Sequence, residues 1–414
     1  MPHTAADTYD LVGRRLHDYQ TVLDDRGTNL AEEIERRYLS KWRSEALCHV
    51  LKVRTALVTG MQEWLVDQGL LNLERVSMSL LTDPLCHDVE HLPRIPYRQS
   101  PYVATHSMIY AKFMACHNPH LRGIFVDSPN IRLELPDRQG RQRGRYLLDF
   151  SQLDVEVRRR RVITLEEYLD DPAGVTAHLR QELRDALNFF EGMARAGMEK
   201  VRSRAALSLD ALGVRLDLPA EPFPVYFQDE TAARFGAGNE ERGLGEASPS
   251  PMFFVVGLLR ENYDLVYPYL RPDGTRRDPK TALSREIFNY DLLMRNQPLQ
   301  GAPEPAREVL SGGLREWLPE AIIPRLLDNG VIPEAPRFQG GRIENIEALG
   351  GYAPFLTVAC ARDQAGRGTF PPTFGAGIGV ERLLWALLRG PQVSSIDDVT
   401  FFGKNPDSAE LFLF

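Results

Sequence analysis

The sequence has little cysteine, no long apolar run and no excess of positive charge. Its four cysteines, spread over 414 residues, are too few and too scattered for a disulfide framework, as expected in a reducing compartment. No apolar run approaches the roughly 20 residues that span a bilayer, and the N-terminal residues lack the apolar core of a signal peptide. The sequence therefore predicts a cytoplasmic protein with no membrane partner.

The charge balance excludes a chain that is basic throughout. Lys and Arg number 49 while Asp and Glu number 57, which gives a formal net charge of −8. A chain of this sign is not a general electrostatic match for nucleic acid, although a local basic patch can still form. The hydrophobic content of 43% and the charged content of 26% are those of a globular protein with a sizeable core.

Adjacent cysteines and histidines raise the question of a zinc site. Three of the cysteines are each followed by a histidine, in the pairs Cys48-His49, Cys86-His87 and Cys116-His117. Structural zinc usually takes ligand pairs separated by two to four residues, because adjacent side chains seldom converge on one ion. The spacing argues against zinc.

Apolar periodicity predicts helices and strands without a regular βαβ alternation. Residues 46–69 and 177–212 carry the stripe of amphipathic helices, and residues 123–134 and 146–157 read as an antiparallel hairpin. Shorter apolar runs predict strands at residues 252–259, 265–270 and 287–295. Together these patterns predict an α+β fold.

A proline-containing stretch interrupts this pattern. Residues 296–338 have little apolar periodicity beyond one helical piece near residues 314–327. We therefore expect residues 296–338 to be an insertion in the main domain.

Residues 370–390 read as a glycine-rich strand that runs directly into a helix. Gly375, Gly377 and Gly379 alternate, so in an extended segment they lie on one face, where a flat ligand can approach the backbone. Arg382 follows in the first helical turn, beside a helix N-terminus that favours phosphate. The pattern fits a nucleotide site, and it also fits a packed strand entering a core helix. Spacing alone leaves both interpretations open.

Four motifs stand in the order of a known enzyme core. They occupy residues 97–102 (YRQSPY), 130–134 (NIRLE), 145–156 and 375–382. In this order they resemble the catalytic core of the class II aminoacyl-tRNA synthetases, in the aspartyl, asparaginyl and lysyl subgroup, and stand-alone asparagine-synthetase-like paralogues of that core.

The resemblance implies an antiparallel sheet flanked by helices. It covers residues 53–414, preceded by an N-terminal helical extension at residues 1–52. A first motif at residues 53–74 implies a homodimer, and Val76 stands where the family almost always has proline.

The second and third motifs imply an ATP site. By resemblance, Arg132 contacts the α-phosphate and Arg382 the γ-phosphate as catalytic residues, and a planar guanidinium suits two oxygens at once. Glu134 and Phe150 would bind the adenine, and Arg145 the outer phosphates. The nucleotide would lie over Gly375, Gly377 and Gly379.

The resemblance also implies Mg²⁺ and an amino-acid pocket. Asp291, in NYDLLMR, is the expected carboxylate ligand, and the family's second acidic ligand is missing a few residues later. The predicted amino-acid-binding residues are Gln99, Ser100, Glu241 and Arg342. Thr105 and His106 stand where aspartate-specific members have a lysine. Arg342 resembles the arginine that grips the side-chain carboxylate in aspartate-specific members, so the predicted substrate is aspartate or a related acid, and the missing lysine favours a derivative or a different acid.

The chemistry implied by the family is attack of a carboxylate on the α-phosphate of ATP, which gives an acyl-adenylate. Residues 1–52 are too short and too helical for the five-stranded barrel that reads the anticodon in members that charge tRNA. We therefore predict an AMP-forming ligase that passes the activated acid to ammonia or another small amine, with tRNA a disfavoured partner.

Two other interpretations stay open. The alternative is an aminoacyl-tRNA or carrier ligase that lacks an anticodon-binding domain and uses the basic residues at 138–145 and 158–161. A third interpretation is a paralogue without catalysis. Retention of Arg132 and Arg382 counts against that one.

Overall fold

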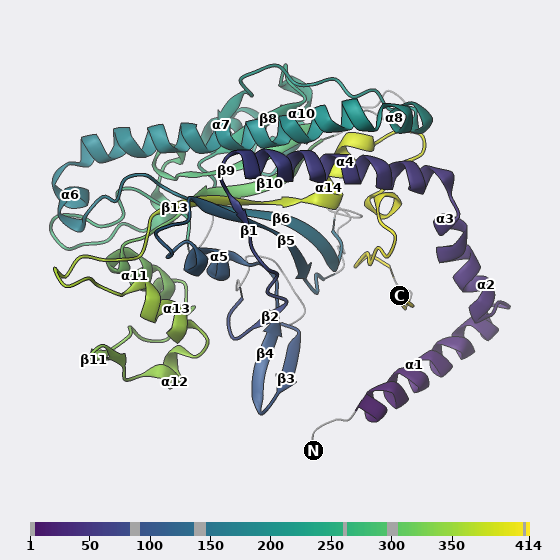
Figure 1. The fold of residues 1–414 in the computed structure, drawn as a ribbon, viewed down its shortest axis with the longest axis horizontal. Coiled ribbons are helices and arrows are strands. Elements are labelled where there is room, and N and C mark those ends of the chain that lie inside the picture. Colours follow the sequence, from purple (N-terminus) through teal and green to yellow (C-terminus); the bar gives the residue numbers. More distant parts are fainter. Residues whose placement is uncertain (1–4, 83–91, 136–145, 260–262, 296–304, 409–410) are drawn as a thin grey trace.

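An eight-stranded sheet forms the centre of the chain (Figure 1). A computed structural model describes residues 5–82, 92–135, 146–259, 263–295, 305–408 and 411–414. The strand order is β1-β5-β6-β13-β10-β9-β8-β7, and neighbours are antiparallel except for the edge pairs β1–β5 and β7–β8. The strands are β1 (Leu71–Asn72), β5 (Gly123–Ile131), β6 (Asp149–Arg158), β7 (Val225–Phe227), β8 (Met252–Val256), β9 (Asn289–Arg295), β10 (Ala306–Leu314) and β13 (Thr373–Gly379). This arrangement confirms the predicted α+β class.

The two faces of the sheet differ because side chains alternate along each strand. Phe374 of β13 and Tyr290 of β9 point to one face, where the ring of Phe190 lies with centroid distances of 6.2 and 5.6 Å. The residues that alternate with them, Gly375 and Asp291, point to the opposite face. We call this second face, defined by the glycines of β13, the glycine face.

Two long helices cover the other face (Figure 1). They are α4 (Glu45–Asp67) and α7 (Pro172–Arg204), which begins at the N-cap Asp171. The two helices approach closely because Gly60 has no side chain: a Cβ there would lie 2.7 Å from the carbonyl oxygen of Ala196. The predicted helix at residues 177–212 is two helices in the structure, since α8 (Ala206–Leu212) follows α7.

Shorter elements complete the fold. The other helices are α1 (Ala5–Asp25), α2 (Leu30–Ile34), the π-helical η1 (Glu35–Leu39), α3 (Ser40–Trp42), α5 (Ile109–Ala115), α6 (Leu165–Asp170), α8 (Ala206–Leu212), α9 (Gln228–Phe235), α10 (Glu240–Ala247), α11 (Pro319–Asp328), α12 (Ile346–Leu349), α13 (Tyr352–Ala359) and α14 (Val380–Leu388), with short turns of 3-10 helix at η2 (Pro279–Thr281), η3 (Ser284–Glu286) and η4 (Ile396–Val399). Small sheets contain β2 (Met78–Ser79), β3 (Arg94–Tyr97) and β4 (Ser100–Ala104), and β11 (Phe338–Gln339) with β12 (Arg342–Ile343). No helix in the described ranges is long and apolar enough to cross a membrane.

Three predicted features differ from the structure. Residues 306–314 form β10, between β9 and β13, so this part of the expected insertion is a central strand. Its paired glycines, Gly312 and Gly313, weaken a strand pattern in the sequence but are hydrogen-bonded to strands on both sides. Residues 265–270 form isolated bridges, such as Val266 to Ile287, instead of a strand. Helix α4 also runs continuously across the predicted boundary between residues 52 and 53.

Candidate active site

Strand register assembles a polar row across the glycine face. Asp154 of β6 pairs with Gly377 of β13, Gly377 pairs with Ser311 of β10, and Ser311 pairs with Asp291 of β9. Residues directly opposite each other in neighbouring antiparallel strands share a face. Two carboxylates and a hydroxyl therefore lie on one line, with a glycine between them.

The glycines of β13 make room for side chains of β6. A Cβ on Gly375 would lie 1.9 Å from Oε2 of Glu156, and a Cβ on Gly377 would lie 2.5 Å from Nε2 of Gln152. At Gly379 the nearest atom would be 3.6 Å away, an ordinary contact. A side chain at Gly375 or Gly377 would therefore clash with Glu156 or Gln152. The space that we expected for the nucleotide is more open at Gly379.

Buried polar atoms without a hydrogen-bond partner gather on the same face. In the part of the chain that the structure describes, they include Ser128 Oγ, Asn130 Oδ1, Gln152 Oε1, Asp154 Oδ2 and Glu156 Oε2. All five belong to alternating positions of β5 and β6, and Ser128 directly opposes Gln152. Because folded proteins rarely leave buried polar atoms unpaired, this cluster indicates a ligand that supplies the bonds.

Two buried cations lie against these carboxylates. Lys112 of α5 approaches Asp154 Oδ1 at 2.6 Å and Glu156 Oε2 at 3.9 Å. Arg315, directly after β10, has Nε 3.4 Å from Glu156 Oε1 and Nη1 2.8 Å from Asp264 Oδ1. Burial alone would lower the pKa of the Arg315 guanidinium, but Glu156 and Asp264 raise it above its usual value. The positive charge at this site is therefore permanent.

Arg132 and Phe150 meet where the β5–β6 hairpin opens. The Arg132 guanidinium carbon lies 5.1 Å from the centroid of the Phe150 ring. The backbone N–H of Arg132 donates to the Leu148 carbonyl at 2.8 Å, and its Nε donates to the His106 carbonyl at 3.1 Å. The structure therefore brings these two predicted ATP-binding residues together and fixes the arginine from two sides.

Arg382 lies in the first turn of α14, as predicted. Its Nη1 is 3.1 Å from Oε1 of Glu308, and its guanidinium carbon is 5.4 Å from the centroid of the Tyr146 ring. The leucines that follow it in α14 are buried, so the packed strand and core helix are confirmed, and the nucleotide site stays a prediction. The helix packs, and its first turn faces polar groups.

A β-bulge brings Glu308 to this face. Glu308 opposes Leu293 and Ser311 opposes Asp291, because the register shifts between Glu308 and Leu310. Without the bulge, a spacing of three residues would put Glu308 and Ser311 on opposite faces. The bulge therefore places a second carboxylate, Glu308, on the neighbouring strand and on the same face as Asp291.

The donor set fits Mg²⁺ that is held jointly with a nucleotide. Asp291, Glu308 and Ser311 offer oxygen atoms on one face, and Mg²⁺ with phosphates needs one or two protein carboxylates. No group of three or more His, Cys, Asp or Glu residues among those described could hold a metal alone. The Asp291 assignment stays a prediction, now with Glu308 beside it.

The other predicted binding residues are not gathered on the glycine face. Gln99 lies exposed in the β3–β4 turn with a left-handed φ of 67°, and Ser100 begins β4. Arg342 lies exposed in β12, and Figure 1 shows both small sheets apart from β13. Glu241 is half-buried in α10, and Arg145 lies outside the described residues together with the basic residues from 138. Glu134 is described and half-buried, just before that gap.

Sequence reasoning missed Lys112, Arg315 and Glu308. Lys112 is the only charged residue in the apolar helix IYAKFMA, which is a usable signal for a functional lysine. Glu308 and Arg315 flank the run VLSGGL, which we assigned to an insertion.

Most of the basic run at residues 158–161 has structural partners. Arg158 donates to the Asn118 carbonyl at 3.2 Å, and Arg159 is buried in an ion pair with Glu182. Arg160 is exposed. The run is therefore mainly part of the packing.

A buried carboxylate beside Arg382 gives a pH-dependent prediction. Burial raises the pKa of Glu381, which accepts a hydrogen bond from the Ser151 N–H at 3.0 Å. The Glu381 carboxyl therefore holds its proton to a higher pH in the folded state than in the unfolded chain. The free energy of unfolding then falls as the pH rises from about 4.5 toward the folded pKa. We expect Glu381→Gln to gain stability over the wild type as the pH is raised from 4 to 7. Urea unfolding of both proteins across this range measures the difference, and a constant difference would contradict it.

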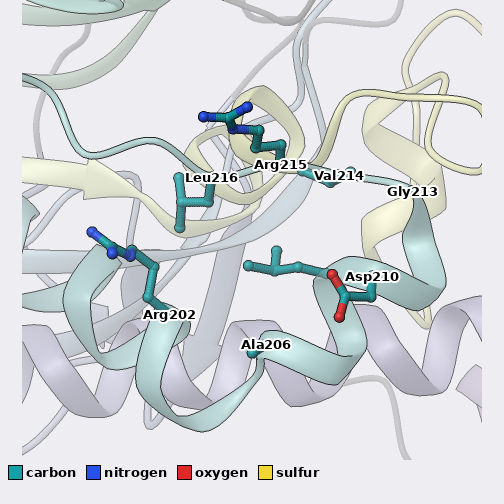
Figure 2. Close-up of a pocket in the computed structure, with 8 residues that line it drawn as sticks. Arg202, Ala206, Asp210, Gly213, Val214, Arg215 and Leu216 are labelled. Atoms are coloured by element: carbon teal, nitrogen blue, oxygen red, sulfur yellow. The ribbon is translucent and has the colours of Figure 1, made fainter.

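A separate hollow of about 520 Å³ lies beside α8 (Figure 2). It is lined by Arg202, Ala206, Leu209, Asp210, Gly213, Val214, Arg215 and Leu216. None of the predicted site residues lines it. The chemistry-bearing groups therefore lie elsewhere, on the glycine face.

Comparison with known proteins places the fold. No profile of a known protein family matches the chain. The aspartate–tRNA(Asp) ligase of Thermococcus kodakarensis is 21% identical over 386 residues, which cover 90% of this chain and 73% of that protein. Asparaginyl-tRNA synthetase from Pyrococcus horikoshii, in complex with asparaginyl-adenylate, superposes with a TM-score of 0.61 at 19% identity, over 89% of this chain and 71% of that one.

A second structure agrees with the first. Asparaginyl-tRNA synthetase from Entamoeba histolytica, also with asparaginyl-adenylate, gives a TM-score of 0.62 at 17% identity, over 93% of this chain and 72% of that one. These matches span the sheet, the covering helices and the glycine face. The chain therefore has the fold of the class II aminoacyl-tRNA synthetase catalytic core.

Proposed function

We propose that this chain uses ATP to activate an amino acid as an acyl-adenylate. The observation that carries the proposal is the strip of residues 146–150, which contacts both predicted phosphate-binding arginines. Tyr146 lies by Arg382, and Leu148 and Phe150 contact Arg132. The related fold of an asparaginyl-tRNA synthetase with bound asparaginyl-adenylate supports this assignment.

Each arginine has a separate role in the proposal. Arg132 holds the α-phosphate beside the attacking carboxylate, Phe150 stacks on the adenine, and Arg382 holds the outer phosphates. Little proton transfer is needed, so catalysis rests on positioning and charge stabilisation. Mg²⁺, when bound by Asp291 and Glu308, would neutralise phosphate charge.

The buried charges favour an acidic amino acid as the substrate. A side-chain carboxylate can bind Lys112 and Arg315, the two buried basic side chains on the glycine face. The α-ammonium group can donate to Asp154 Oδ2 and Gln152 Oε1, which lack hydrogen-bond partners. Aspartate or a close relative satisfies both sets of groups.

We propose ammonia or another small amine as the first candidate acceptor.

A tRNA is the second candidate acceptor, and the expectation that it is disfavoured has no support from the relatives. The name of the Thermococcus protein specifies tRNA(Asp) as its substrate. The exposed β3–β4 hairpin also carries Arg94, Tyr97 and Arg98, a basic and aromatic surface suited to RNA.

Two measurements test the function. ATP–pyrophosphate exchange with a panel of amino acids should be supported by aspartate or a related acid, and exchange with none of the panel would refute the proposal. Product analysis with ammonium, hydroxylamine and total tRNA then separates the acceptors. Charged tRNA formed as fast as any amide would favour the second candidate.

We further propose a homodimer through the exposed apolar side chains of the first motif. Val66 and Leu71 of this motif are 57 and 59% exposed. We expect Leu71→Arg to convert a dimer into a monomer in sedimentation velocity. A wild-type protein that sediments as a monomer at micromolar concentration would contradict this.

A further inference from the structure

The C-terminal residues 397–408 and 411–414, called here the C-terminal segment, lie between the N-terminal helices and the candidate site. Helices η1 and α3 contact the segment on one side, and the start of β6 contacts it on the other. Figure 1 shows the end of the chain beside α3. The segment therefore connects the N-terminal helices with the residues that lead into β6.

An aromatic cluster attaches the segment to the N-terminal helices. The Trp42 indole stacks on Phe401 with a centroid distance of 5.5 Å and an interplanar angle of 15°, and its Nε1 donates to the Phe401 carbonyl at 2.8 Å. Phe414 packs edge-on against Tyr38 at 5.0 Å and Trp42 at 5.1 Å. Phe402 also contacts Trp42. We call Tyr38, Trp42, Phe401, Phe402 and Phe414 the aromatic clasp.

Polar contacts hold the backbone of the same segment. Arg37 Nη1 donates to the Leu411 carbonyl at 2.9 Å, and the Leu413 N–H donates to the Tyr38 hydroxyl at 3.1 Å. Asn405 Nδ2 donates to Asp397 at 3.3 Å. The segment is therefore held at both ends as well as by its rings.

Lys404 connects this held segment to the candidate site. Its carbonyl accepts a hydrogen bond from the Leu148 N–H at 2.8 Å, and its Nζ lies 3.2 Å from Asp149 Oδ2. The Leu148 carbonyl in turn accepts the Arg132 N–H at 2.8 Å, and Arg132 lies on the Phe150 ring. A continuous chain of contacts therefore runs from the clasp through Lys404 to the proposed phosphate and adenine groups.

We propose that Lys404 is a positioning residue for the nucleotide, held in place by the aromatic clasp. This inference rests on the proposed function, since it assigns the N-terminal helices to the ATP half of the site. The clasp fixes the Lys404 carbonyl, which fixes Leu148 and thereby the backbone of Arg132. Among the described contacts, Lys112 and Arg315 of the amino-acid half are not part of this series from the clasp to Arg132. Binding of the amino acid should therefore not respond to changes in the clasp.

Amide hydrogen exchange tests the positioning without requiring activity. In Trp42→Ala we expect the Leu148 amide to exchange about fivefold faster or more, the change for one weakened hydrogen bond. Exchange in β9, remote from the segment, should stay unchanged and serves as the internal reference. Trp42→Phe, which keeps a ring against Phe401 and loses the Nε1 bond, should give an intermediate value and covers the case in which Trp42→Ala does not fold.

Kinetics on the same variants separates positioning from general damage. Trp42→Ala should raise KM for ATP about threefold to tenfold in pyrophosphate exchange and leave KM for the amino acid within twofold, whereas Trp42→Phe should give an intermediate KM for ATP. The inference would be overturned by a Trp42 variant in which amide hydrogens of the C-terminal segment exchange faster while the Leu148 amide hydrogen exchanges at the wild-type rate. A wild-type protein without ATP–pyrophosphate exchange activity would refute only the proposed function. Amide hydrogen exchange at Leu148 would still decide the positioning.

Discussion

Arg382→Ala should abolish most of the ATP–pyrophosphate exchange while the fold stays intact. The guanidinium lies in the first turn of α14, beside Glu308 and Tyr146, on the side of the sheet where phosphate is expected. Loss of one charge-stabilising donor at a reacting group costs on the order of a hundredfold to a thousandfold in rate. The side chain is partly exposed, so its removal leaves no large cavity and the melting temperature should change little.

Arg389→Ala is the matched control for this variant. Arg389 caps the C-terminal end of the same helix, and its guanidinium carbon lies 5.4 Å from the centroid of the Trp385 ring. Exchange should stay within about twofold of the wild type, because this end carries no phosphate group in the proposal. Near-normal exchange in Arg382→Ala, or an equal loss in both variants, would show that the first turn of α14 does not bind the nucleotide.

Lys112→Met should lower the free energy of unfolding by about 3–5 kcal/mol. Methionine keeps the length and the apolar stem of the side chain but leaves Asp154 buried without its nearest cation and leaves Glu156 with Arg315 alone. Breaking one partner of a buried ion pair costs this much because the remaining charge has no water around it. Urea unfolding followed by circular dichroism measures the loss.

A surface pair supplies the control for Lys112. Lys200 lies 2.5 Å from Glu63, with side chains 26 and 56% exposed. Lys200→Met should therefore cost less than about 1 kcal/mol. The double variant Lys112→Met/Asp154→Asn should lose less stability than the sum of its two single variants, since it no longer buries an unpaired carboxylate at residue 154. A loss below 1 kcal/mol for Lys112→Met would mean that water reaches these charges.

Patterns that are local in sequence predicted most of the fold. The β5–β6 hairpin, helix α4 and the strand–helix unit β13–α14 follow from apolar periodicity within single segments. Arg382 was placed correctly in a first helical turn because its position depends only on the glycines before it. The pairing of Arg132 with Phe150 likewise follows from a hairpin whose two strands are adjacent in sequence.

The pocket that we propose for the amino acid could not be predicted because its groups come from distant segments. Lys112 and Arg315 meet Glu156 from a helix and from the end of β10, and no local spacing links them. Strand β10 itself was missed, since Gly312 and Gly313 have low strand propensity and are stabilised only by the neighbours β9 and β13. Gln99 stays a predicted amino-acid-binding residue from its motif, and the structure places it at an exposed hairpin tip.

The bulge in β10 has a consequence for comparing this chain with distant relatives. Because one extra residue between Glu308 and Leu310 decides which face Glu308 occupies, the number of residues in this strand matters as much as their identity. An alignment that opens a gap inside β10 would exchange the outward and inward positions of every residue before the gap. At identities near 20%, residue equivalence in this strand is therefore safer when it is taken from hydrogen-bond register than from sequence.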